Sequence, residues 1–224
     1  MVLYHGSERI IEMPQYGVGK PYNDYGKGFY CTESFDLAAE WAVDRERDGY
    51  VNKYEIELSS MKILNLAENN AADNVLKWFA ILLDNRIFAI NTPIAKEAKR
   101  YVLESFLPDY NVYDIICGYR ADDSYFSFAQ DFLNNTISLQ QLARAMRYGN
   151  LGEQIVLKSE KAFERISFLG EKEVDRLIYY PKKEERDRNA RSKYHNLDKN
   201  KFDVSDTFIM DIIKKELILD EILL

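Results

Sequence analysis

The spacing of apolar residues predicts short strands near both ends of the chain. Val2–His5 is an apolar stretch that stops at Gly6, which suits a buried strand followed by a sharp turn. Residues 52–58 alternate, with Tyr54, Ile56 and Leu58 on one face and charged residues on the other, as in a strand with one solvated side. Further strands are expected at residues 61–64, 112–119, 155–157 and 165–169.

Helical spacing predicts most of the remaining elements. A helix from Phe35 to about Arg47, capped by Thr32 or Ser34, carries Trp41 on its apolar face. Helices are also expected over residues 69–104 with a break at Thr92-Pro93, over 131–147, after Ser159 and over 205–219. This order indicates one α+β domain spanning residues 1–224, with a helical insertion at about 66–150 and a helical C-terminal tail at about 182–224.

Composition limits the class of protein. The chain has 224 residues, of which 46% are hydrophobic and 30% are charged, and it has no apolar run close to the roughly 20 residues that span a bilayer. The first residues lack the pattern of a signal peptide, so a cytoplasmic location without membrane association is expected. Cys31 and Cys117 alone form neither a disulfide framework nor a zinc site, and no metal site is expected.

Charge is distributed unevenly. The net charge of −7 argues against nonspecific binding to nucleic acid, which depends on a cationic surface. Residues 182–193 nevertheless hold six basic side chains and three acidic ones. We expect a solvated helix with internal ion pairs here, and the alternative is a contact for an anionic partner or for a pyrophosphate group.

Two motifs near the start of the chain carry the strongest functional signal. Residues 3–7 read Leu-Tyr-His-Gly-Ser, residues 25–30 read Tyr-Gly-Lys-Gly-Phe-Tyr, and Trp41 follows on a predicted helix. A histidine at a strand end, glycines that suit a turn with positive φ, and single aromatic residues are each more often structural. Their combined order and spacing favour a binding site, because two aromatic faces can enclose a flat ring.

This arrangement resembles the His-Tyr-Glu class of ADP-ribosyltransferases, the class of diphtheria toxin and the poly(ADP-ribose) polymerases. The resemblance covers roughly residues 2–58 and 150–169, and it implies a split β-sheet core with NAD as substrate. It implies that His5 bonds a ribose hydroxyl, that the Gly6 backbone holds the nicotinamide amide, and that Tyr30 and Trp41 stack on nicotinamide. The same resemblance assigns Ser7 and Gly28 to the NAD site and makes His5 and Tyr30 part of the catalytic set.

The class also needs a glutamate on a later strand, and two neighbours compete for this role. Glu153 and Gln154 enter the strand at 155–157, and successive side chains on a strand point to opposite faces. A carboxylate stabilises an oxocarbenium-like ribose, so Glu153 is the favoured catalytic residue, and its replacement by Ala is expected to abolish transfer. The alternative is Gln154, which can bond ribose hydroxyls without the charge.

Two departures from the family pattern limit which transferase activity is expected. Leu37 and Ala38 stand where poly(ADP-ribose) polymerases have Lys and Ser, so polymer elongation is not expected. The expected enzyme is a mono-ADP-ribosyltransferase that modifies a macromolecule, with a protein acceptor favoured over nucleic acid. The alternative is an NAD-binding module or an NAD glycohydrolase without transfer to a macromolecule. Residues 120–124 either cap a helix or supply Arg120 or an Asp to the cleft.

The chain is also similar to bacterial members of the ADP-ribosyltransferase clan that tend to be encoded beside a small partner. This implies the toxin of a toxin–antitoxin or antiphage system, with a small antitoxin protein as partner. The helical middle or the helix at 205–219 would then dock the partner, although burial of the C-terminal helix in the protein's own core is the favoured interpretation.

Overall fold

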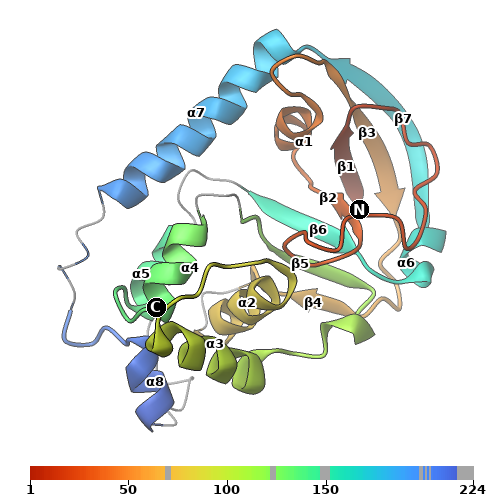
Figure 1. Ribbon diagram of the computed structural model, residues 1–224. Coiled ribbons are helices and arrows are strands. Elements are labelled where there is room, and N and C mark those ends of the chain that lie inside the picture. Colours follow the sequence, from red (N-terminus) through yellow and green to blue (C-terminus); the bar gives the residue numbers. More distant parts are fainter. Residues whose placement is uncertain are drawn as a thin grey trace.

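Two β-sheets built from segments distant in sequence form the centre of the molecule (Figure 1). The computed structural model describes residues 1–68, 72–121, 125–146, 152–196, 199, 201 and 203–215. The first sheet is antiparallel, with the order β1 (Val2–Ser7), β3 (Gly49–Ile56) and β7 (Ile166–Val174). The second has the order β2 (Phe29–Cys31), β6 (Glu153–Leu157), β5 (Ile115–Tyr119) and β4 (Ile63–Asn65), in which only β4 and β5 pair in parallel.

Three apolar clusters separate four layers: α1, the first sheet, the second sheet and a layer of helices. Leu3, Tyr54 and Ile56 of the first sheet pack with residues such as Ile155 and Leu157 of the second, so the sheets lie face to face. Helix α1 (Phe35–Ala42) packs through its alanines on the other face of the first sheet. The outer face of the second sheet is covered by the largest apolar cluster, which includes residues of α2 (Ala72–Asn85), α3 (Pro93–Phe106), α4 (Tyr125–Leu133), α5 (Leu139–Ala145) and α8 (Ile209–Lys215).

Most predicted elements are present, and several boundaries differ for local reasons. Helix α1 is capped by the Ser34 hydroxyl and ends at Ala42, five residues before the expected end. The helix expected over 131–147 is instead α4 and α5, because Asn135 has a φ of 61° and Ser138 begins a new helix with a capping box. Thr92 caps α3 after a break that starts beyond Asn85.

The middle of the chain contributes a strand to the second sheet as well as helices. β5 lies within residues 66–150 and pairs with β6 on one side and β4 on the other. The remaining elements of the structure are the short helices η1 (Tyr110–Val112) and α6 (Glu160–Glu164) and the long helix α7 (Arg176–His195). The α+β class is therefore as expected.

The C-terminal elements lie against different parts of the molecule (Figure 1). Helix α8 buries Ile209 and Ile212 in the largest core cluster, so its apolar face serves the protein's own core, as favoured from the sequence. The part of the expected helix after residue 215 lies outside the described residues. Helix α7 packs against α1 and runs past α4, and it carries the basic segment that starts at Lys182.

Candidate functional site

A cavity of about 790 Å³ brings the N-terminal motifs together with distant segments of the chain. This volume is within the range of about 300–1,000 Å³ that is usual for small-molecule sites. His5, Gly6, Ser7, Gly28, Tyr30, Trp41 and Gln154 all line it, and so do several charged residues: Lys20, Asp24, Arg86, Arg120, Lys183, Asp187 and Arg191. The residues predicted to form the NAD site therefore line one cavity, with the exception of Glu153.

His5 is fixed as a neutral hydrogen-bond acceptor toward the cavity. Its Nδ1 lies 2.7 Å from the carbonyl oxygen of Tyr30, and its ring stacks on Phe29 with a centroid distance of 4.3 Å. Because a carbonyl oxygen only accepts, Nδ1 carries the proton in this contact. Burial lowers the pKa of His5 and outweighs the opposing effect of that bond, so the imidazole is neutral at pH 7 and Nε2 is free to accept.

Gly6 and Ser7 have structural duties that the sequence did not show. A Cβ at Gly6 would overlap the carbonyl oxygen of Ala38, so glycine is needed there for the close approach of β1 to α1. This packing requirement is independent of any contact between the Gly6 backbone and a ligand. The Ser7 hydroxyl donates to Arg9 O at 2.6 Å and accepts from Asn52 Nδ2 at 3.0 Å, which leaves it committed to the following loop.

Asn52 is buried and forms hydrogen bonds with the segment from His5 to Ile11. Its amide nitrogen also contacts His5 O at 3.3 Å, and its Oδ1 accepts from Ile11 N at 2.8 Å. These bonds hold β1, β3 and the loop after Ser7 in one arrangement. The sequence contained a signal for this role, because Asn52 occupies the same strand face as the apolar Tyr54 and Ile56.

Tyr30 lines the cavity, and its hydroxyl holds the preceding turn. The hydroxyl donates to Gly26 O at 2.6 Å and accepts from Tyr25 N at 3.1 Å. Burial raises the pKa of Tyr30, so it remains a neutral phenol. Gly26 has a φ of 70°, as a turn requires, whereas Gly28 lacks a positive φ and is small because a Cβ would meet Val156 at 2.5 Å.

Lys158 also binds the turn between Tyr25 and Tyr30. Its ammonium group donates to Tyr25 O at 2.6 Å and to Lys27 O at 2.7 Å. Tyr25 is buried and donates through its hydroxyl to Tyr119 O at 2.7 Å, and Asp24 accepts from Ala121 N at 2.9 Å. The turn that carries Gly28 and Tyr30 is therefore anchored to both β5 and the residue after β6.

Trp41 projects from α1 into the cavity wall. The guanidinium carbon of Arg120 lies 5.5 Å from its ring centroid, which is a cation–π contact. The indole Nε1 is buried and makes no hydrogen bond among the described residues. Arg120 thus enters the cleft, which was one of the two interpretations of residues 120–124. Asp122, Asp123 and Ser124 lie outside the described residues.

The structure separates the two candidates at the start of β6. Gln154 lines the cavity and is 8% exposed, and its Oε1 is buried without a hydrogen-bond partner among the described residues. Glu153 is exposed and is not part of the cavity lining. Strand alternation explains the separation: Gln154 shares a face with Val156 toward the helical core, and Glu153 starts the opposite face.

Leu37 and Ala38 of α1, which stand where poly(ADP-ribose) polymerases have Lys and Ser, pack against other residues of this protein. Leu37 is buried and would collide with a side chain at Gly152, which has a φ of 83°. Ala38 is fully buried beside Gly6. Neither offers a polar group to a ligand, so hydrogen bonds to the cavity come from other elements.

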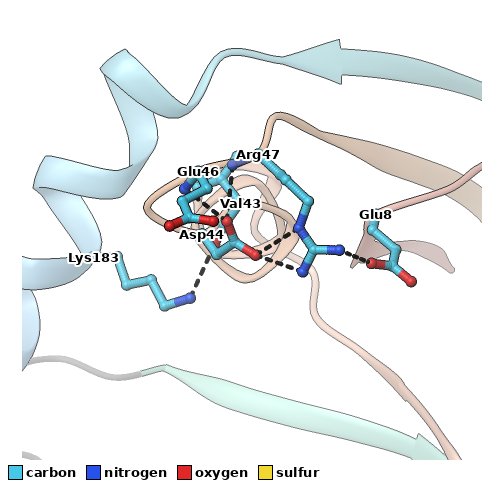
Figure 2. A network of polar contacts seen from close by, with 6 residues as sticks. All are labelled: Glu8, Val43, Asp44, Glu46, Arg47 and Lys183. Carbon is cyan, nitrogen blue, oxygen red and sulfur yellow. Dashed lines mark hydrogen bonds and ion pairs between the residues drawn. The ribbon is translucent and has the colours of Figure 1, made fainter.

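Helix α7 closes one side of the cavity through residues that lie well beyond the N-terminal motifs. Arg186 forms two bonds with Glu40 of α1, Nε to Oε2 at 2.8 Å and Nη2 to Oε1 at 2.9 Å. Figure 2 shows Lys183 reaching from α7 to the carbonyl oxygen of Val43, where the separation is 3.1 Å. In the same view Arg47 bridges Asp44 and Glu8, which ties the end of α1 to the loop after β1.

Comparison with known proteins identifies a family but no activity. The model of a family described as "Protein of unknown function (DUF3990)" matches residues 1–168. No curated protein and no solved structure matches the chain. The matched segment contains β1 to β6 and ends within β7, so α7 and its contribution to the cavity lie after it. None of the described helices has the length and apolar character needed to cross a membrane.

Proposed function

We propose an activity for this protein, which belongs to the DUF3990 family: its cavity binds NAD, and the enzyme transfers the ADP-ribose part to a macromolecular acceptor. One observation carries the proposal. Segments far apart in sequence bring His5, Tyr30, Trp41 and Gln154 to one cavity, where Trp41 Nε1 and Gln154 Oε1 are buried without partners. Buried polar atoms are nearly always bonded, so unpaired ones in a cavity wall indicate a polar ligand.

The residues fit the nicotinamide riboside part of NAD. His5 Nε2 accepts a hydrogen bond from a ribose hydroxyl, because Nδ1 already donates to Tyr30 O. Gln154 Oε1 accepts from a second hydroxyl and orients the ribose. The rings of Tyr30 and Trp41 supply apolar faces for nicotinamide, and Arg120 already covers part of Trp41.

The proposed reaction is a substitution at the anomeric carbon of the nicotinamide ribose. The acceptor nucleophile forms a bond to this carbon, the bond to nicotinamide breaks, and nicotinamide leaves with the electron pair as a neutral molecule. The acceptor loses its proton to the solvent. Gln154 supplies orientation and a dipole, but not the full negative charge that stabilises an oxocarbenium-like state most strongly.

The experiment is to mix purified protein with NAD and cell lysate and to follow nicotinamide release and label transfer. Release together with a labelled macromolecule is the expected result. Absence of release with every lysate contradicts transfer. Mass spectrometry of the labelled product identifies the acceptor, and the net charge of −7 favours a protein over nucleic acid.

A second candidate function is NAD binding without turnover, or NAD hydrolysis without a macromolecular acceptor. The observation that favours it is the neutral Gln154 in the position that faces the cavity. Calorimetric binding of NAD with no nicotinamide release would select the binding module, and release without label transfer would select the glycohydrolase. Failure to bind NAD would contradict all three.

The proposed biological role is that of a bacterial toxin or antiphage effector held inactive by a small partner protein. The support is the family resemblance of the two N-terminal motifs alone. Expression of the protein without its genetic neighbours should arrest growth, and a variant that lacks Gln154 should not. Harmless expression of an active enzyme would contradict this role.

A further inference from the structure

The cavity is cationic although the protein is acidic. Among the described residues, its lining includes five basic side chains, which are Lys20, Arg86, Arg120, Lys183 and Arg191. Two carboxylates, Asp24 and Asp187, also line it, while the chain as a whole has a net charge of −7. Such a local excess of positive charge indicates an anionic ligand.

The cations are not equally available to a ligand. Arg86 lies 3.4 Å from Asp24, and this contact offsets its charge. No carboxylate forms an ion pair with Arg120, Lys183 or Arg191 among the described residues. Lys20 likewise has no ion pair among the described residues, but it is an exposed residue of the loop before β2. Arg120, Lys183 and Arg191 are therefore the unpaired cations that follow β5 or belong to α7.

Arg120 and Lys183 line the same cavity, and each is held by a separate contact with α1 or the residue after it. Arg120 follows β5 and packs on Trp41, and Lys183 is fixed to the carbonyl oxygen of Val43 (Figure 2). Burial lowers the pKa of Lys183, and the charge of Arg120 lowers it further, although Asp187, Asp44 and Glu40 oppose this. An anion between the two cations would relieve their repulsion.

Helix α7 extends this pair into a row. Lys183, Asp187 and Arg191 are spaced four residues apart, so they lie on one face of the helix, and all three line the cavity. Asp187 lies between the two basic residues and reduces the net charge of the row. Two cations on one helix face, together with Arg120 in the same cavity lining, suit a ligand with more than one negative charge.

We propose that Arg120, Lys183 and Arg191 bind the diphosphate of NAD, so that α7, which lies after the family segment, supplies the diphosphate subsite of this protein. This inference rests on the proposed NAD-binding function. Lysine serves as a compact charge for a phosphate oxygen, and arginine offers a planar pair of donors. The nicotinamide end of NAD then lies toward His5 and Gln154.

The test compares charged and uncharged ligands in matched variants. Lys183→Gln/Arg191→Gln removes the two cations of α7 that line the cavity and keeps a polar side chain at both positions. Arg188→Gln is the control, because Arg188 is exposed on the same helix and does not line this cavity. The double variant should bind NAD about tenfold or more weakly by calorimetry, as loss of charge-assisted bonds implies. Its affinity for nicotinamide, and both affinities of the control, should not change.

Inorganic pyrophosphate separates this inference from the proposed function. The wild type should bind pyrophosphate and the double variant should not. If the wild type binds NAD and the double variant binds it equally well, the diphosphate subsite is wrong and NAD binding stands. If the wild type binds pyrophosphate but not NAD, the anion site stands and the proposed function is wrong. If the double variant keeps its NAD affinity but loses label transfer, the cations serve an anionic acceptor, and the inference is overturned.

Discussion

Gln154 and Trp41 each keep a polar atom buried and unbonded at the cavity wall. A buried polar group without a partner costs roughly 1–3 kcal/mol of folding free energy. A polar ligand that bonds both atoms accounts for their place in one cavity wall. The stability of the free protein and its affinity for the ligand should therefore respond in opposite directions when these atoms are removed.

The first prediction concerns Gln154→Met. Methionine is similar in size and has no amide, so the variant should be as stable as the wild type, or more stable by about 1 kcal/mol. Nicotinamide release should fall about a hundredfold or more, as for loss of other transition-state bonds. Urea denaturation and a release assay measure the two effects.

Glu153→Ala is the control for this prediction. From the sequence alone, Glu153→Ala was expected to abolish transfer, but Glu153 is exposed and outside the cavity lining. The variant should keep nearly full release. A larger loss for Glu153→Ala than for Gln154→Met would return the catalytic role to Glu153.

The second prediction concerns the pH dependence of NAD binding through His5. Burial lowers the pKa of His5 below its ordinary value of 6.5, so NAD affinity should be constant from pH 8 to pH 6.5 and fall on further acidification. Protonation there converts Nε2 from an acceptor to a donor and adds a positive charge beside the cationic nicotinamide ring. Titration calorimetry across this range measures the effect.

The same shift affects stability with a defined sign. Between the folded pKa and 6.5 the unfolded chain binds more protons, so the free energy of unfolding decreases as pH falls through this window. The side chain in His5→Gln cannot be protonated. This variant should therefore show neither the fall in NAD affinity nor the fall in the free energy of unfolding that His5 causes at acidic pH. An acid-side loss of affinity that persists in His5→Gln would exclude His5 as its cause.

At the level of elements, the ion pair between Glu40 of α1 and Arg186 of α7, called the clamp below, joins the helix that carries the cationic row to α1. Glu40 is 1% exposed, and its carboxylate bonds Arg186 through two nitrogens. A carboxylate at this depth depends on its partner, because removal of one member of a buried pair leaves an uncompensated charge. The pair thus links helix packing directly to the site.

The third prediction is that Arg186→Ala lowers the free energy of unfolding by about 3–5 kcal/mol. Arg100→Ala is the matched control, because Arg100 pairs with Glu97 and Glu104 on the exposed face of α3 and should change stability little. Glu40→Leu/Arg186→Met should recover most of the loss. Equal effects of the two single arginine variants in urea denaturation would contradict a special role for the clamp.

Elements with a clear local signal were predictable from the sequence, and those that depend on tertiary contacts were not. The alternation around Tyr54 identified β3, Ser34 was one of two expected caps of α1, and Thr92-Pro93 marked the break before α3. Helix α1 ends early because Asp44 accepts from the backbone of Glu46 and Arg47 and forms a turn. The apolar spacing from 131 to 147 did not reveal that Asn135 interrupts it with a left-handed backbone.

At the level of the whole molecule, the two halves of the cavity differ in how far the sequence predicts them. The half formed by His5, Tyr30 and Trp41 was predictable because its members lie within 41 residues of the start and have characteristic spacing. For the cationic half, the sequence offered a contact with a pyrophosphate group only as the alternative interpretation of residues 182–193, because the choice depends on how α7 packs against α1. The choice between Glu153 and Gln154 likewise depends on which face of β6 meets the cavity.

Global and local charge oppose each other at the cavity, and their balance gives the last prediction. NAD carries more negative than positive charge at neutral pH, so the net charge of −7 repels it while Arg120, Lys183 and Arg191 attract it. Added salt reduces the screening length from about 30 Å at 0.01 M to about 8 Å at 0.15 M. Screening weakens both the repulsion by the net charge and the attraction by the local cations, so the larger of the two sets the direction of the change in affinity. If the local cations are in control, NAD affinity falls as salt rises, and the affinity for uncharged nicotinamide stays constant. If the global charge is in control, NAD affinity rises with salt. We expect the fall, because basic side chains outnumber carboxylates in the cavity lining and act on the ligand at shorter range than most of the protein's acidic residues. Titration calorimetry at both salt concentrations distinguishes the two signs.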